Sequence, residues 1–271
     1  MCLAWSLTAQ PAPAPPQKGK IAILGATAHL GNGKVIANSL ITFENGKLLV
    51  VADMTGIRID QNSFAKIINA NGKHVYPGFI AANTALGLNE ISAVRATRDD
   101  REIGNLNPHI RAIVAYNTDS KVTPTIRSNG MLMAQIVPGG GRIDGQSSVV
   151  QLDAWNWEDA AYKMDDGIYL SYPSMVSWSW RTRSVSKNKK YAEQLQEVED
   201  YFIEAHAYSK NKKLSSKNLK FEAMRGLFDG SKNLYVKTNA AKSIMEAVLL
   251  FKKFNIIPVI VELSLGWWLI F

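Results

Sequence analysis

Short alternations of apolar and polar residues fill the chain between residues 21 and 76. The segments 21–24, 39–44 and 47–51 are rich in β-branched residues, and Asn45-Gly46 separates the last two. Asn-Gly between two apolar runs is the strongest short-range signal for a β-hairpin. The pattern therefore predicts a small, mainly antiparallel β module over 21–76.

After Pro77-Gly78 the pattern changes to short apolar runs that alternate with segments of helical periodicity. Repeated strand-then-helix units predict a parallel sheet in an α/β fold, either open or closed into a barrel. The predicted strands number about six, so an eight-stranded barrel over 77–261 would be incomplete. The predicted strands are 79–84, 131–137, 149–153, 167–172, 234–238 and 257–261, and the predicted helices 110–116, 192–208, 221–228 and 240–254.

Both ends of the chain differ from the rest. Residues 1–20 combine a short apolar start with a Pro/Ala-rich spacer, which predicts a signal remnant and linker. This pattern favours a periplasmic or secreted protein, although a cytoplasmic location stays open. Residues 262–271 are almost wholly apolar but too few for the roughly 20 residues of a membrane span. Together with the strand count, this apolar tail raises the hypothesis that the chain is truncated.

Composition and charge narrow the function classes. The chain has 271 residues, 46% of them hydrophobic, which is typical of a globular protein. Its single cysteine excludes a cysteine-based metal site. Of the basic residues, 15 lie in 1–180 against 14 acids, and 16 lie in 181–271 against 9 acids. Acids interrupt this basic region and no nucleic-acid recognition motif accompanies it, so we expect a solvated surface and no nucleic-acid partner.

The segment 72–88, GKHVYPGFIAANTALGL, resembles the signature of the amidohydrolase superfamily, closest to imidazolonepropionase-like members. The residues that fit its frame are Gly72, Lys73, Val75, Pro77, Gly78, Ile80, Thr84 and Gly87. The resemblance implies a small β-sandwich module followed by a (β/α)8-type barrel. It also implies a hydrolase for carbon–nitrogen bonds other than peptide bonds, such as those of cyclic amides.

The metal ligands of that family do not carry over. The family places two histidines, two residues apart, at the end of the first barrel strand to bind a divalent metal such as zinc. Asn83 and Ala85 stand at those positions here, and Lys237 or Thr238 stands where a later strand would end in a ligand histidine. A zinc site needs three or four nitrogen, sulfur or oxygen ligands. We therefore predict no metal ligands and no evident cofactor, and whether the chain is an enzyme stays open.

Two loops that follow predicted strands supply further candidates for binding a small molecule. Gly140 and Arg142 belong to the segment PGGGR, whose backbone amides and guanidinium suit an anion. Asp153 and Trp155 belong to the segment DAWNWED, which offers an acid and an aromatic platform, although packing of the loop and capping of the next helix are the favoured explanation. With Asn83 and Lys237, these four residues form the set of predicted substrate-binding residues.

Three function classes remain. The resemblance favours an amidohydrolase-like hydrolase, and the missing ligands favour a noncatalytic ligand-binding paralogue or an inactive truncated product. A nucleotide-binding oxidoreductase is a distant third, because the stretch ILGATAHLG has alanine where a phosphate-binding glycine is needed. The sequence predicts no transmembrane segment and leaves the oligomeric state open.

Overall fold

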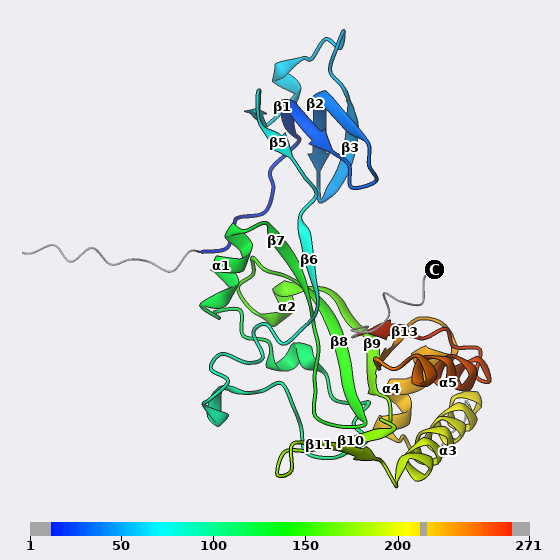
Figure 1. Cartoon of the computed structure of the whole chain (residues 1–271). Helices are drawn as coiled ribbons and strands as arrows, with labels where there is room; N and C mark the ends of the chain where they lie inside the picture. The colour runs from blue at the N-terminus through cyan, green and yellow to red at the C-terminus, as the bar shows by residue number, and fades with distance from the viewer. Residues whose placement is uncertain (1–11, 212–215, 262–271) are drawn as a thin grey trace, which may run out of the picture. The chain divides into compact units, whose positions relative to one another are not determined.

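The computed structural model of the protein describes residues 12–211 and 216–261. Its chain divides into two compact units, Met1–Phe79 and Ile80–Phe271 (Figure 1). Most of the predicted signal segment and the whole predicted apolar tail lie outside the described residues. No helix within the described ranges is long and apolar enough to cross a membrane.

The first unit is a five-stranded mixed sheet with strands in the order β3-β2-β1-β4, and β5 also pairs with β1. β2 pairs antiparallel with β1 and β3, whereas β4 and β5 run parallel to β1. Asn45 and Gly46 have φ values of 49° and 72°, as a tight hairpin turn requires, so the predicted hairpin is confirmed. The strands are β1 (Ile21–His29), β2 (Val35–Glu44), β3 (Lys47–Asp53), β4 (Lys66–Asn69) and β5 (His74–Val75).

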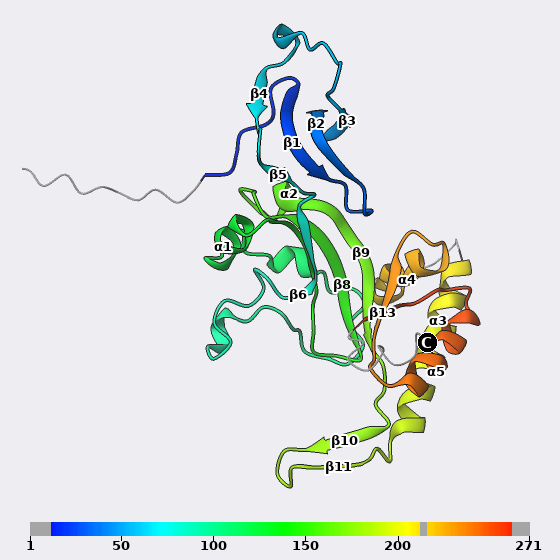
Figure 2. The same cartoon turned by 45° about the horizontal axis from the view of Figure 1, so that its top comes forward.

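The second unit is built on a six-stranded sheet that curls like half of a barrel (Figures 1 and 2). Its strand order is β13-β12-β9-β8-β7-β6. The strands are β6 (Phe79–Thr84), β7 (Met131–Ile136), β8 (Ile143–Gln151), β9 (Ala161–Ser171), β12 (Asn233–Lys237) and β13 (Val259–Val261). All six predicted strands of this region are present, although β8 and β9 each begin six residues earlier than predicted.

The prediction of an all-parallel sheet is wrong for β7, β8 and β9. β8 pairs antiparallel with both neighbours, while β12 is parallel to β9 and to β13. The segments that join β7 to β8 and β8 to β9 contain no long helix. Parallel neighbours need a crossover of a dozen or more residues, so these short connections produce a meander instead.

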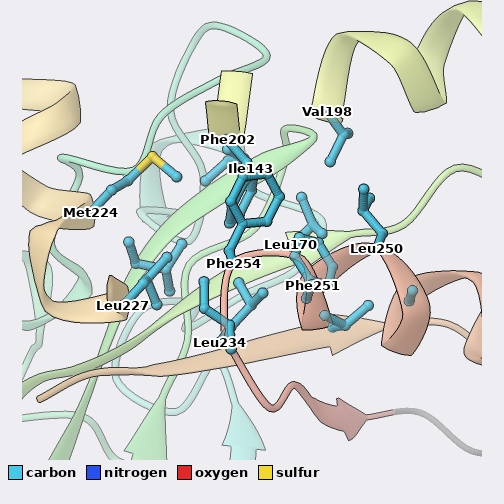
Figure 3. Packing of buried hydrophobic residues seen from close by; sticks show 14 of the residues in the cluster. Ile143, Leu170, Val198, Phe202, Met224, Leu227, Leu234, Leu250, Phe251 and Phe254 are labelled. Carbon is cyan, nitrogen blue, oxygen red and sulfur yellow. The ribbon is translucent and has the colours of Figure 1, made fainter. Parts of the chain in front are cut away.

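Three helices cover one face of this sheet: α3 (Tyr191–Lys210), α4 (Leu219–Phe228) and α5 (Ala241–Lys252). Phe202 of α3 packs against Phe251 of α5, with ring centroids 4.9 Å apart (Figure 3). Ile168, Leu170, Leu234 and Val236 face these helices from β9 and β12. Side chains alternate along a strand, so the residues between them, including Tyr169 and Tyr235, face the inner side of the curled sheet.

The remaining elements are short. The predicted helix at 110–116 is a single 3-10 turn, η3 (Ala112–Ala115), and the turns η1 (Gln61–Ser63) and η2 (Arg95–Thr97) lie in loops. α1 (Val122–Ser128) and α2 (Trp157–Ala160) flank β7 and β9 in sequence. β10 (Val176–Ser179) and β11 (Ser184–Lys187) form a separate two-stranded hairpin.

A Gly145→Ala substitution tests the close packing at the irregular start of β8. Gly145 has a φ of 141°, and a Cβ there would lie 2.7 Å from the carbonyl oxygen of Ile110. We expect a loss of at least about 2 kcal/mol in the free energy of unfolding, measured by chemical denaturation. Gly230→Ala, also at positive φ but with open space around the site, is the control and should cost only about 1–2 kcal/mol. Equal losses would contradict this account of β8.

Candidate functional site

A buried ion pair lies at the edge of the sheet where β9 and β12 end, here called the carboxyl edge. Lys237, the last residue of β12, places its Nζ 3.2 Å from Oδ2 of Asp144 on β8. The Asp144 side chain is only 1% exposed. Ser171 Oγ donates to the same oxygen at 3.2 Å, and the Gly141 amide donates to Oδ1 at 2.9 Å. Both carboxylate oxygens of this buried group are therefore satisfied.

Lys237 connects this pair with the aromatic inner face of the sheet. Its Nζ lies 5.2 Å from the centroid of the Tyr169 ring, a distance at which the ammonium is attracted to the ring face. The lysine side chain is 18% exposed, in contrast to its partner carboxylate. The lysine side chain is thus the less buried partner of the pair.

A second cluster of hydrogen bonds on the inner face is centred on the Gln135 side chain of β7. Its Oε1 accepts from Tyr169 Oη at 2.9 Å and from the backbone amide of Asn83 at 3.4 Å. Its Nε2 donates to Asp166 Oδ2 at 3.3 Å and to Ser147 Oγ at 3.5 Å. This amide links four strands, β6, β7, β8 and β9, on the inner face.

Asp166 is the charged end of this second cluster. Tyr235 Oη donates to Asp166 Oδ2 at 2.5 Å, and Lys163 Nζ lies 2.5 Å from Oδ1. The rings of Tyr235 and Tyr169 are stacked, with centroids 4.7 Å apart. Through these contacts the hydrogen-bonded cluster extends from β9 to the neighbouring strand β12.

Two pKa shifts follow from these contacts. Burial by itself raises the pKa of Asp166, but the hydrogen bonds from Lys163, Tyr235 and Gln135 and the charge of Lys163 outweigh it, so the pKa is lowered. Burial, reinforced by the hydrogen bond to Asp166, raises the pKa of Tyr235 to about 12. The cluster is therefore an ionised carboxylate held by neutral phenol and amide donors and one ammonium at neutral pH.

The donor set at the carboxyl edge does not fit a divalent metal. Asn83, the penultimate residue of β6, has a φ of 51° and directs its backbone amide at Gln135, and Ala85 has no ligand atom in its side chain. Lys237 brings a positive charge to the end of β12, where it repels a cation. Among the described residues, no three His, Cys, Asp or Glu side chains form a group that holds a metal ion.

Arg142 and Gly140 lie in the loop that leads to β8. Arg142 is half-buried and donates from Nη1 to the Ser171 carbonyl at 2.7 Å, so it adjoins the ion pair at the carboxyl edge. Burial lowers its pKa, although Glu197 and Asp144 oppose the effect. A Cβ on Gly140 would lie 2.8 Å from Cβ of Arg101, so this glycine has a packing role in addition to its predicted binding role.

Asp153 and Trp155 lie away from the other candidates. Because β8 is antiparallel to β9, its end at Gln151 lies at the edge of the sheet opposite the carboxyl edge. Asp153 forms an ion pair with Arg127, and Trp155 is 67% exposed. Asn156 accepts a hydrogen bond from the Asp159 amide and caps α2, as the capping alternative predicts. The structure places Arg142 and Lys237 beside Ser171, joins the Asn83 backbone amide to Gln135, and leaves Asp153 and Trp155 at the opposite edge.

Sequence reasoning missed most of the inner-face residues. Tyr235 and Lys237, and Tyr169 and Ser171, are pairs two residues apart in strands that were predicted, so the alternation of side chains contained this signal. Asp144, Gln135 and Asp166 carry no such signal. Asp144 was missed because the start of β8 was not predicted, and the other two because only the fold pairs them.

A cavity of about 490 Å³ lies between the segments 99–102 and 109–115, beside the PGGGR loop, since Pro138 and Arg101, the neighbour of Gly140, line it. Its polar lining combines acids and arginines, and Arg111 is held by Asp165 at 2.8 Å. Burial lowers the pKa of His109, which also lines it. No residue of the predicted set lines this cavity.

An Asp166→Asn substitution tests the second cluster. The lowered pKa means that ionised Asp166 stabilises the fold above its ordinary pKa of 3.8, and that this contribution is lost as the pH falls through the lower folded value. We expect the variant to lose about 1–3 kcal/mol of unfolding free energy at pH 7. The difference should shrink as the pH falls below 3.8, as measured by urea denaturation across pH. Asp119→Asn, at an exposed position, is the control; a pH-independent difference for Asp166→Asn would contradict the assignment.

Comparison with solved structures identifies the fold in which this site lies. No protein-family model matches the chain, and no curated protein matches it. Its structure is similar to that of an amidohydrolase from Thermotoga maritima MSB8, with a TM-score of 0.76 and 19% identity, over 92% of this chain and 66% of that one. Weaker likenesses are to a molinate hydrolase (TM-score 0.40, 13% identity, 86% and 56% covered) and a metal-dependent hydrolase from Pyrococcus horikoshii OT3 (TM-score 0.23, 13% identity, 89% and 48% covered). The chain therefore spans less than two thirds of the length of these structures, and over that span it has the fold of an amidohydrolase.

Proposed function

We propose that this protein binds a small molecule that carries a carboxylate or an amide carbonyl, through the Lys237 ammonium at the carboxyl edge. The observation that carries the proposal is the Lys237–Asp144 pair, in which the acid is buried and the lysine side chain is partly exposed. A fixed, partly desolvated ammonium is an attractive partner for an anionic or strongly polar oxygen. Arg142 adds a second cation close to the same edge.

The Lys237 ammonium supplies the positive charge that a metal ion supplies in the resembled family. A metal there polarises the substrate carbonyl, and its ligands would have to converge at the ends of the barrel strands. Asn83, Ala85 and Lys237 do not provide such ligands, whereas Lys237 provides the positive charge itself. An ammonium binds a carbonyl oxygen without activating a water molecule, which favours ligand binding over hydrolysis.

A second candidate function is the hydrolysis of carbon–nitrogen bonds outside peptides, such as those of cyclic amides. It is favoured by the fold similarity to the Thermotoga amidohydrolase and by the resemblance of segment 72–88 to the superfamily signature, with an imidazolonepropionase-like activity as its narrowest form. Elemental analysis of the purified chain, and ring-opening assays with added zinc or manganese, test this candidate. Stoichiometric metal together with ring opening would favour the hydrolase over the binding protein.

Titration of the chain with hydantoin, dihydrouracil and their ring-opened carboxylates tests the binding proposal. We expect the carboxylates to bind more tightly than the neutral rings, because they make a charge-assisted hydrogen bond to Lys237. Lys237→Met should weaken this binding by at least about tenfold, which corresponds to about 1.4 kcal/mol in calorimetric titration. Lys237→Arg should retain part of it.

Two controls separate binding from folding. Lys242→Met removes an exposed lysine of α5 and should leave the affinity unchanged. The double variant Asp144→Asn/Lys237→Met removes both charges, so it avoids a buried unpaired carboxylate and should fold even where Lys237→Met does not. Unchanged carboxylate affinity in a folded Lys237 variant would overturn the proposal.

A further inference from the structure

The hairpin formed by β10 and β11 is chemically unlike the rest of the second unit. It follows β9 in the chain, precedes α3, and extends away from the curled sheet (Figures 1 and 2). Asn188 ties its base together, because its amide donates to the Met175 carbonyl at 2.9 Å and its side chain donates to the Ser174 carbonyl at 2.8 Å. The two strands are therefore held as a defined unit.

The two faces of the hairpin differ strongly. Side chains alternate along each strand, and the register pairs Ser177 with Ser186 and Ser179 with Ser184 on one face. The other face pairs Trp178 with Val185 and Val176 with Lys187. One face is thus made of small hydroxyl residues and the other of large apolar residues with a lysine at its base.

The apolar face is uncovered. Trp178 is 51% exposed and Trp180, in the turn, is 87% exposed, and their rings meet edge to face with centroids 6.1 Å apart. Val176 and Val185 beside them are also exposed. A two-stranded hairpin with an exposed apolar face is only marginally stable in water, so a covering surface would stabilise it.

The charges around the hairpin indicate which kind of surface covers its apolar face. Between Asp166 and Glu193 the sequence has no acidic residue and five basic ones: Arg181, Arg183, Lys187, Lys189 and Lys190. None of these five forms an ion pair within the part of the chain that the structure describes. The complementary partner is therefore negatively charged and also accommodates tryptophan.

We propose that the β10–β11 hairpin adsorbs to the headgroup region of an anionic lipid membrane. Tryptophan is enriched at membrane–water interfaces, where its ring lies among the headgroups and its N–H remains hydrated. Lysine and arginine near an anionic lipid surface add electrostatic attraction, and the two effects together give binding. A nucleic acid attracts the five cations equally but gives no reason for the valines on the same face as the tryptophans. The hairpin attaches the protein at the surface and does not span the bilayer.

Co-sedimentation of the full chain with phospholipid vesicles tests this proposal. We expect at least tenfold stronger partitioning to vesicles of equal parts phosphatidylcholine and phosphatidylglycerol than to phosphatidylcholine alone. Added salt should weaken the binding, because the attraction between exposed charges is screened. Binding of equal strength to both kinds of vesicle, or to neither, would overturn the proposal.

Matched variants locate the contact. Trp178→Ser/Trp180→Ser should reduce partitioning at least fivefold, whereas Trp155→Ser, which changes an exposed tryptophan at the opposite edge of the sheet, should not. Arg181→Gln/Arg183→Gln should also reduce it at least fivefold, whereas Arg58→Gln/Lys66→Gln, with the same loss of net charge in the first unit, should reduce it less than twofold. Thermal melts should coincide, since the substituted side chains are exposed.

Binding and competition experiments with single-stranded DNA, a polyanion without an apolar layer, test the alternative partner. Binding to single-stranded DNA that depends on Arg181 and Arg183 but not on Trp178 and Trp180, with no partitioning to anionic vesicles, would assign the hairpin to nucleic acid and overturn the membrane proposal. Competition by DNA with retained dependence on both tryptophans in the vesicle assay would support it, because lipid then contributes the apolar part of the contact.

Discussion

The carboxylate of Asp144 is almost wholly removed from water, and much of the second unit is arranged so that this charge has partners. An unpaired buried carboxylate destabilises a fold by several kcal/mol, so its neighbours are constrained. Lys237 comes from β12, Ser171 from β9 and the Gly141 amide from the loop before β8. The ion pair and the hydrogen bonds to the same carboxylate therefore join three segments at the carboxyl edge. The lysine side chain is less buried than the acid.

The alternation of side chains along β9 and β12 links this site to the stability of the unit. Ile168, Leu170, Leu234 and Val236 pack beneath α3, α4 and α5, while the residues between them make the polar inner face. A shift of one residue in the register of either strand would exchange the two sets. The apolar core thus holds Tyr169, Tyr235 and Lys237 in the positions that the proposed binding needs. The hairpin with its exposed tryptophans follows the same strand, β9, after Ser171.

The sequence predicted the local elements well, because hairpin turns and helical periodicity are encoded within a few residues. The Asn45-Gly46 turn and the helices α3, α4 and α5 agree closely with prediction. The pairing direction of β8 was missed because β8 and β9 were predicted to begin too late, so the connections between β7, β8 and β9 looked long enough for parallel crossovers. For the same reason Asp153 and Trp155 were grouped with Lys237 although they lie at the opposite edge. Asp144 could be identified as the partner of Lys237 only from the fold.

A double-mutant cycle on Asp144 and Lys237 tests the central claim most directly. The unfolding free energies of the wild-type chain, Asp144→Asn, Lys237→Met and the double variant give the coupling between the two side chains. We predict a coupling of at least about 1.5 kcal/mol, with the double variant more stable than Lys237→Met alone, because removal of both charges leaves no buried unpaired carboxylate. A coupling near zero would contradict the account, since the two charges would then not depend on each other.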